Sequence, residues 1–222
     1  MLQVDDATVK KTYDGLVALK PSDFGDFAQY VPKLAPRMAK QYADSDPGIL
    51  VALITMNYVV LQPGEAVYVP ADGIHAWLSG DIIECIARSN NVLNFGFCPR
   101  ADRNNTDLVC DLLTFTPHSA EEAMLKPTSW ERSQKGKTKV FNAPMSEFDI
   151  LETKLGKGEK EVLGALKGPS VFVVTSGGAT MRVKEQGEVS LGEGKVYFVA
   201  QGTGLEFEAG GEGAVVYTAF VE

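Results

Sequence analysis

Histidine and cysteine are scarce in this chain, and their scarcity limits the metal sites that it can build. Among 222 residues there are two histidines, His75 and His118, and three cysteines, none of which has the C-x-x-C spacing of structural zinc sites. An odd number of cysteines without that spacing favours reduced thiols, as in the cytosol. The sequence therefore argues against a scaffold held by disulfides.

Long apolar runs and basic runs are also missing. No apolar stretch reaches the ~20 residues of a membrane-spanning helix, and no basic-then-apolar signal opens the chain. With 29 acidic and 21 basic residues the formal net charge is -8, which disfavours nucleic acid and anionic membranes as partners. A small phosphorylated ligand stays compatible, because it needs only a few local cations. We expect a soluble, cytoplasmic protein.

The sequence is rich in apolar residues and is interrupted often by turn residues. Hydrophobic residues make up 45% of the chain, enough to bury a core, and 22 glycines and 11 prolines are typical of a β-rich fold. Residues 1–47 differ, because apolar residues recur there at helical spacing after the N-cap candidates Asp5 and Asp6. Pro32 and Pro36 predict two short helices within 24–42.

Beyond residue 47 the pattern changes to short segments between turns. Strands are expected at 50–60, 66–69, 75–78 and 82–88, and a helix at 106–113. Residues 116–140 have the composition of a polar linker, in which the basic cluster 132–139 is solvated. Strands return from 141 onward, with turns expected at 156–158, 176–178 and 210–211. This predicts a helical segment (1–47), a first β unit with a linker (48–140) and a second β unit (141–222).

An internal repeat supports two β units. Residues 61–75 align without gaps on 191–205, so that Gly64 corresponds to Gly194 and the apolar strand positions coincide. At the position of His75 the second copy has Leu205. We therefore expect the second unit to be structural and free of metal.

His75 has the most informative surroundings. Gly64, Pro70 and Gly73 precede it in a turn-strand-turn pattern, and its spacing from them resembles the second conserved motif of cupins. A histidine after a turn at the mouth of a small β-barrel is well placed to bind a metal or a polar ligand. A hydrogen-bonded structural role is the alternative for an isolated histidine.

A longer run resembles a family. The chain reads IHAWLSGD at 74–81, EC at 84–85, SNNV at 89–92 and GFCPR at 96–100. This run is similar, in fixed register, to one in the zinc-dependent (type I) mannose-6-phosphate isomerases, particularly the fungal ones. The resemblance implies a mainly β fold with two cupin-type jelly-roll barrel units, the first incomplete, after a short helical N-terminal segment. It also implies zinc-assisted interconversion of mannose 6-phosphate and fructose 6-phosphate.

The resemblance also implies roles for single residues. His75 matches the zinc-binding histidine, and Glu84 an acidic residue of the active site and our candidate acid or base. Arg100 matches a basic residue suited to the sugar phosphate or to charge on the substrate. Trp77 replaces a tyrosine and can stack on the sugar, while Asn94 stands where the family commonly has an arginine. For Glu84, pairing with a nearby arginine is the alternative.

Part of the family pattern is missing. The chain has no Gln-x-His pair and no metal-binding Glu before the matched run, so the zinc site would be incomplete. By the resemblance, the chain begins near the end of a helical insertion of the family. Barrel strands without neighbours leave an exposed edge, which predicts a homo-oligomer through sheet edges. Two hypotheses follow: an isomerase, or a non-catalytic cupin (a pseudoenzyme) that binds a sugar or hexose phosphate or acts as a subunit.

Overall fold

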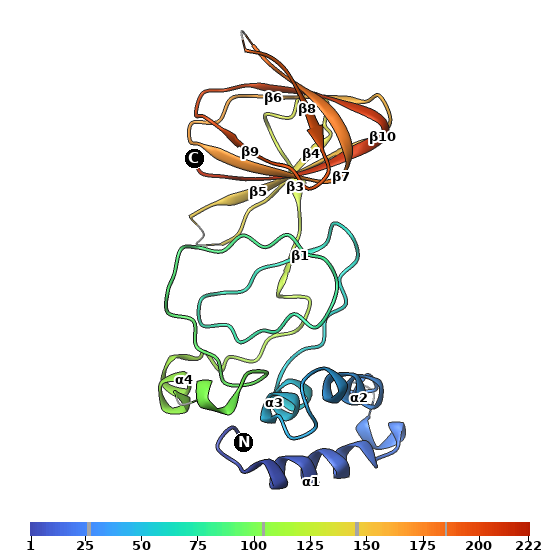
Figure 1. The fold of residues 1–222 in the computed structure, drawn as a ribbon, viewed down its shortest axis with the longest axis vertical. Helices are drawn as coiled ribbons and strands as arrows, with labels where there is room; N and C mark the ends of the chain where they lie inside the picture. The colour runs from blue at the N-terminus through green and yellow to red at the C-terminus, as the bar shows by residue number, and fades with distance from the viewer. Residues whose placement is uncertain (26–27, 104, 145–146, 185) are drawn as a thin grey trace. The chain divides into compact units, whose positions relative to one another are not determined.

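The computed structural model describes residues 1–25, 28–103, 105–144, 147–184 and 186–222. The chain divides into two compact units. The first contains 1–60, 69–80 and 89–123, and the second contains 61–68, 81–88 and 124–222. Helices α1 to α4 belong to the first unit and the strands to the second, and every strand pair described is antiparallel (Figure 1). The protein is mainly β, as the sequence predicts.

The first unit is organised around a small helical core. Its elements are α1 (Asp6–Val17), the 3-10 turn η1 (Pro21–Phe24), α2 (Val31–Gln41), α3 (Pro47–Thr55), the 3-10 turn η2 (Arg100–Asp102) and α4 (Thr106–Leu112). As expected, Asp5 caps α1, accepting a hydrogen bond from the Thr8 amide at 2.9 Å. Val9, Met38 and Ile49 are almost fully buried and join α1, α2 and α3.

Two predictions for this region were wrong. Residues 24–42 do not form two helices split by proline, because α2 runs through Pro36 without a break. Pro32 lies in the first turn, where its missing N–H costs nothing, and Pro36 is exposed while Leu34 and Met38 are buried. Burial of one apolar face therefore outweighs the hydrogen bond that Pro36 cannot make.

The segment 50–60 was predicted as a strand, and most of it is helix α3. Asp46 caps this helix, with its carboxylate 2.8 Å from the Gly48 amide, and Pro47 occupies the first helical position. A short apolar run is compatible with a buried helix as well as with a strand. Here the start signal Asp-Pro decides between them.

The other strands expected in the first β unit are largely absent. Only β1 (Ala66–Val67) forms within 66–69, and the segments 75–78 and 82–88 have no regular structure. A strand needs a neighbour for its backbone groups, and these two segments pair with no strand among the described residues. The first β unit is thus incomplete, whereas the helix expected at 106–113 is confirmed as α4.

The second unit is an antiparallel β structure. Its further strands are β2 (Met124–Leu125), β3 (Thr128–Ser129), β4 (Thr138–Phe141), β5 (Asp149–Leu155), β6 (Lys160–Leu163), β7 (Ser170–Val183), β8 (Gly187–Gly192), β9 (Val196–Val199) and β10 (Leu205–Phe220). β1 pairs with β2, and eight strands form a sheet in the order β3-β4-β5-β10-β7-β8, with β6 on β10 and β9 on β7. The prediction of a homo-oligomer through sheet edges stays a prediction.

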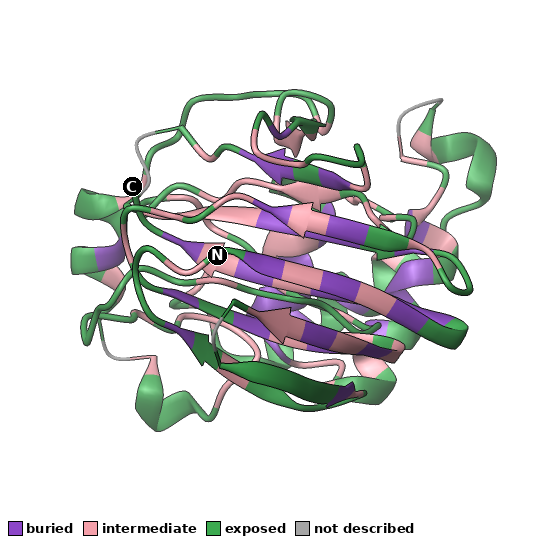
Figure 2. Ribbon diagram, turned by 90° about the horizontal axis from the view of Figure 1, so that it is seen from above, coloured by how far each residue is buried: buried purple, intermediate pink, exposed green. Residues whose placement is uncertain are grey.

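The interior of this unit is filled with apolar side chains. Buried and less buried residues alternate along β7 and β10, as the bands in Figure 2 show. Phe172 lies edge-on to Phe207, with 5.8 Å between ring centroids, and stacks on Tyr197 at 4.9 Å. Leu205, which replaces the histidine of the first copy of the repeat, is part of this core.

Glycine-rich positions that were predicted as turns lie inside long strands. Residues 176–178 belong to β7 and 210–211 to β10, and only 156–158 is a turn. The pairing of β7 with β10 shifts register between Ala209 and Ala214, which marks a bulge. Glycines allow such strands to bend between two parts of a barrel, which explains why a turn signal occurs in a continuous strand.

The segment 116–140 is not a solvated linker throughout. From residue 124 it contributes β2, β3 and β4, and Trp130 is buried beside Phe220 with 6.2 Å between ring centroids. In the basic cluster 132–139, Arg132 forms an ion pair with Glu222 at 2.5 Å. The linker prediction was therefore wrong for 124–140, because one large aromatic residue attaches this polar stretch to the barrel.

The repeated glycines have the same local role. Gly64 has φ 90° before β1 and Gly194 has φ 76° before β9. At Gly64 a Cβ atom would lie 2.6 Å from the Lys154 Nζ, whereas at Gly158, with φ 67°, it would meet nothing within 4 Å. Because Lys154 is a flexible side chain that can move aside, the requirement at Gly64 lies mainly in its backbone conformation.

We expect Gly64→Ala and Gly158→Ala each to destabilise the second unit by roughly 1–2 kcal/mol, because both positions have a left-handed φ that a side chain disfavours. Urea denaturation followed by the fluorescence of buried Trp130 measures both variants. A clearly larger loss for Gly64→Ala would contradict the expectation that Lys154 moves aside.

Candidate functional site

His75 is held by the turn that precedes it. The turn closes with a hydrogen bond from the Gly73 amide to the Pro70 carbonyl at 2.9 Å. The His75 Nδ1 lies 3.0 Å from the Gly73 carbonyl oxygen, and the ring is exposed. Donation from Nδ1 leaves the lone pair on Nε2, which is the usual arrangement of a metal-binding imidazole.

Trp77 lies next to His75. The two rings meet edge-on with 6.1 Å between centroids, and Trp77 is 42% exposed. Leu78 packs against the helical core, and its carbonyl accepts a hydrogen bond from Gln41 at 3.4 Å. The segment is therefore anchored through Leu78, while His75 and Trp77 are both accessible.

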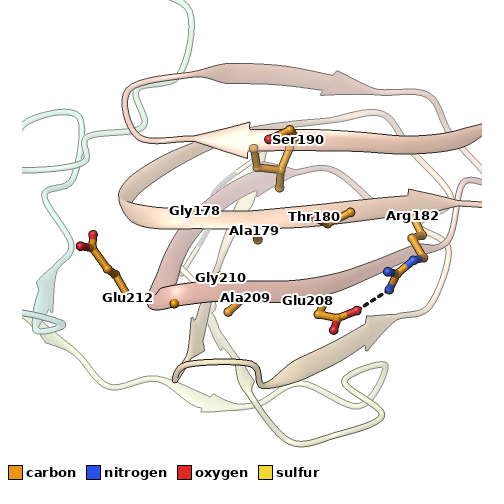
Figure 3. Close-up of a pocket in the computed structure, with 11 residues that line it drawn as sticks. Gly178, Ala179, Thr180, Arg182, Ser190, Glu208, Ala209, Gly210 and Glu212 are labelled. Atoms are coloured by element: carbon orange, nitrogen blue, oxygen red, sulfur yellow. Dashed lines mark hydrogen bonds and ion pairs between the residues drawn. The ribbon is translucent and has the colours of Figure 1, made fainter.

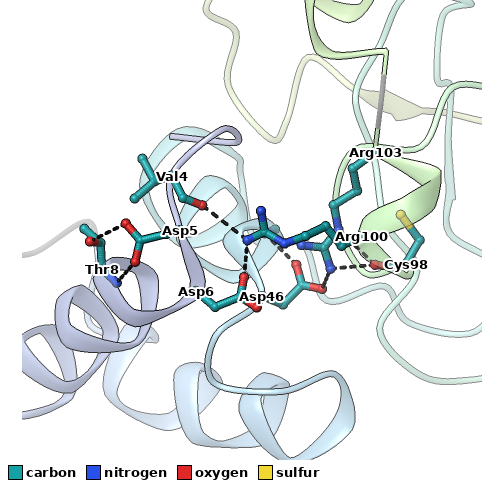
Figure 4. A network of polar contacts seen from close by, with 9 residues as sticks. Val4, Asp5, Asp6, Thr8, Asp46, Cys98, Arg100 and Arg103 are labelled. Atoms are coloured by element: carbon teal, nitrogen blue, oxygen red, sulfur yellow. Dashed lines mark hydrogen bonds and ion pairs between the residues drawn. The ribbon is translucent and has the colours of Figure 1, made fainter.

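Arg100 contacts the start of the first helix. Its guanidinium forms an ion pair with Asp6 and donates to the Val4 carbonyl at 3.5 Å (Figure 4). Both charged side chains remain more than half exposed. Such a solvent-exposed ion pair contributes little free energy, so an anion of higher charge can replace the Asp6 carboxylate at Arg100.

Beside Arg100 lies a buried ion pair that the sequence did not predict. Asp46, only 6% exposed, accepts from Arg103 at 2.7 Å and from the Phe97 amide at 3.2 Å while it caps α3. The Arg103 Nε donates to the Cys98 carbonyl at 2.9 Å (Figure 4). Asp46 and Arg103 thereby fasten the turn that leads to Arg100 onto the N-terminus of α3.

The glycines at this junction make the contact possible. A Cβ atom on Gly96 would lie 2.6 Å from the Cα of Gly48, so the two backbones approach more closely than any side chain allows. Phe97 follows with φ 58°, an uncommon value for a bulky residue. The turn is therefore specified by packing. The Asp-Pro-Gly start signal of α3 was the only sequence hint of it.

Two further predicted site residues lie on the surface. Asn94 is exposed in the first unit, and Glu84 is exposed in the 81–88 part of the second. Within the first unit, the structure places His75 and Trp77 in mutual contact. The roles assigned to all five predicted site residues stay predictions.

A zinc site is not assembled by the described residues. No group of three or more His, Cys, Asp and Glu side chains gathers in that part of the chain, whereas zinc sites take three or four protein ligands. His75 supplies one of them, so the residues at hand do not fit the ion. No helix in the described ranges has the length and apolarity to span a bilayer.

Known relatives match the whole sequence. No family model matches it. Mannose-6-phosphate isomerase of Schizosaccharomyces pombe is 33% identical over 229 residues, which cover 100% of this chain and 55% of the relative. The enzyme of that name from Candida albicans is 32% identical, covering 100% and 53%, and that of Saccharomyces cerevisiae is 35% identical, covering 91% and 46%. The chain spans about half the length of these curated relatives.

A solved structure gives the fold. A mutant of phosphomannose isomerase from Salmonella typhimurium superposes with a TM-score of 0.70 at 20% identity, covering 98% of this chain and 55% of that one. The predicted cupin-type fold is thereby confirmed. In sequence as in fold, the chain corresponds to about half of a mannose-6-phosphate isomerase, and it belongs to that family.

Proposed function

We propose that this chain acts on hexose phosphates and takes part in the interconversion of mannose 6-phosphate and fructose 6-phosphate. The observation that carries the proposal is the match over 100% of the chain, at 33% identity, to a relative named mannose-6-phosphate isomerase. A cytoplasmic location is part of the same proposal, because sugar phosphates are metabolites of the cytosol.

The chemistry requires a proton to move between two neighbouring carbons. A carboxylate is suited to that task as a general base, and Glu84 is our candidate. Arg100 would bind the phosphate group by exchanging the single charge of Asp6 for a dianion. The exposed face of Trp77 would pack against the C–H face of the sugar. Asn94 would add hydrogen bonds without charge.

A metal adds no step to this scheme. His75 remains our candidate for a zinc ligand, since its Nδ1 contact directs the lone pair to Nε2. The described residues do not complete the ligand set, so we assign no part of the reaction to zinc.

A coupled assay of mannose 6-phosphate isomerisation tests the proposal on the full chain. We expect turnover that Glu84→Gln reduces by at least about a hundredfold, in the range of a lost proton-transfer group. Glu121→Gln is the control, because Glu121 is also an exposed glutamate and has no part in the proposed scheme. Equal losses in both variants would contradict a role for Glu84.

The second candidate is a non-catalytic hexose phosphate binder. It is favoured by the single imidazole without further ligands and by Arg100, which already holds an anion. In that case mannose 6-phosphate should raise the melting temperature without being converted. Arg100→Ala should abolish the shift and Arg37→Ala, an exposed arginine on α2, should preserve it. Turnover in the same preparation would exclude this candidate.

A further inference from the structure

The second unit carries a cavity that the proposed isomerase function does not use. It has a volume of about 490 Å³, within the range of small-molecule sites (Figure 3). Its walls come from β7, β8 and β10 at the place where glycines interrupt the side-chain pattern of the long strands. All of it lies within one compact unit.

One wall is a row of polar side chains set by the strand register. Ser190 of β8 is opposite Thr180 of β7, and Thr180 is opposite Glu208 of β10. Residues opposite one another in an antiparallel sheet share a face and lie about 5 Å apart. Among the residues that the structure describes, neither the Thr180 nor the Ser190 hydroxyl has a hydrogen-bond partner. The row therefore offers two unused hydroxyls beside a carboxylate.

The end of this row is held by Arg182. Its guanidinium donates to Glu208 at 2.7 Å (Figure 3). It also donates to Glu188 at 2.6 Å. Arg182, followed by Lys160, keeps the pKa of the Glu208 carboxyl below its usual value, so Glu208 stays an ionised acceptor. A carboxylate oxygen can accept more than one hydrogen bond, so Glu208 can still accept one from a ligand in the cavity.

Glycine backbone lines part of the rest of the cavity, together with Ala179, Leu191 and Ala209. Gly178, Gly210 and Gly211 contribute no side chain, and a Cβ atom built on Gly211 would have no atom within 4 Å. A flat ring can therefore approach the strands closely. Beside the polar row, this floor matches a pyranose ring, which has C–H groups on its faces and hydroxyls on its edge.

The charge of the lining excludes a phosphorylated ligand. Arg182 is the cation among the lining residues, and it is engaged by carboxylates from Glu188, Glu206 and Glu208. A further carboxylate, that of Glu212, lines the cavity (Figure 3). Carboxylates outnumber cations, so a phosphate dianion would be repelled.

We propose that this cavity binds an unphosphorylated saccharide of one or two rings. The unused hydroxyls, the ionised acceptor, the backbone floor and the negative surroundings each select a neutral polyhydroxyl ligand. The site lies wholly in the second unit and needs neither His75 nor Arg100. The proposal therefore stands or falls independently of the isomerase function.

The test is a titration of the full chain with D-glucose, D-mannose and maltose, followed by saturation-transfer NMR. Mannose 6-phosphate serves as the charged competitor. We expect at least one of the three sugars to bind. The double variant Thr180→Val/Ser190→Ala should weaken it about tenfold, as two lost hydrogen bonds to a neutral ligand imply. Ser129→Ala, a hydroxyl removed from an exposed position of β3, should leave binding unchanged.

A second variant separates the site from folding defects. Gly211→Leu places a side chain into open space at the cavity, so it should block saccharides while the melting temperature is preserved. No binding by any of the three sugars would overturn the proposal. So would binding that survives Gly211→Leu, or that mannose 6-phosphate displaces with equal affinity. An inactive isomerase that still binds saccharide would leave it intact.

Discussion

Replacing Glu161 by glutamine is expected to destabilise the second unit by about 3–5 kcal/mol, because a fully buried carboxylate then loses its charge while its donors stay in place. Glu161 accepts from the Lys137 amide at 2.7 Å, the Lys135 amide at 2.9 Å and the Ser133 hydroxyl at 2.6 Å. Its own strand adds the Val162 amide at 2.8 Å. An amide side chain would turn an NH₂ group toward these N–H donors.

The loss is measured by urea denaturation, with buried Trp130 as the fluorescent reporter in a Trp77→Phe background. A change of this size corresponds to roughly 10 °C in melting temperature. Glu159→Gln is the matched control, because Glu159 lies two residues away, pairs with Lys137 at 2.5 Å and has a side chain that is 40% exposed. It should change little, and similar losses in both variants would show that burial of Glu161 is not what matters.

The same carboxylate makes the second unit sensitive to acid. Burial alone would raise the pKa of Glu161, but the hydrogen bonds from Ser133, Lys135, Val162 and Lys137 outweigh it and hold the pKa below the usual value. Because this pKa is lower in the folded state than the value near 4.5 of the unfolded chain, ionised Glu161 stabilises the fold fully above pH 4.5. That stabilisation is lost as the pH falls through the pKa of the folded state. Wild type should therefore lose more stability than Glu161→Gln between neutral and strongly acidic pH, and parallel curves would contradict this assignment.

Sequence patterns correctly predicted the features that depend on residues close together in the chain. The cap at Asp5, helix α4 and the glycine turns before β1 and β9 follow from local spacing, and the structure has each of them. Glu161 could also have been noticed, since it occupies an inward position of β6 next to buried Leu163. The donors that satisfy it come from more than twenty residues earlier, so the sequence shows the buried charge and not its partners.

Long-range packing explains what the patterns missed. Pro36 was expected to break a helix, and the buried face of α2 keeps it intact. The glycines near Gly178 and Gly210 were expected to turn the chain, and β7 and β10 bend there instead. At the candidate site, the resemblance singled out His75 and Trp77, but their contact is seen only in the structure. The resemblance could not reveal that Arg103 forms an ion pair with Asp46.

Removing Asp46 is the second change with a large expected effect. Asp46→Ala leaves the Arg103 guanidinium buried without its counter-ion and removes the cap of α3, which should destabilise the first unit by about 3–5 kcal/mol. All four α-helices belong to this unit, so the helical signal in far-UV circular dichroism reports its unfolding. Asp6→Asn is the control, since the exposed pair of Asp6 with Arg100 should contribute no more than about 1 kcal/mol.

A double variant distinguishes the ion pair from the helix cap. Asp46→Asn keeps a capping oxygen for the Gly48 amide and leaves Arg103 unpaired, so it should lose most of the stability that Asp46→Ala loses. Adding Arg103→Met removes the unpaired charge and should restore more than half of that loss, because uncompensated burial is the main penalty. If Arg103→Met lowers the stability of the first unit further, the helix cap and the contact of Arg103 with the Cys98 carbonyl contribute more than the ion pair. Since the same turn carries Arg100, the restored double variant should also regain hexose phosphate binding if our assignment of Arg100 is right.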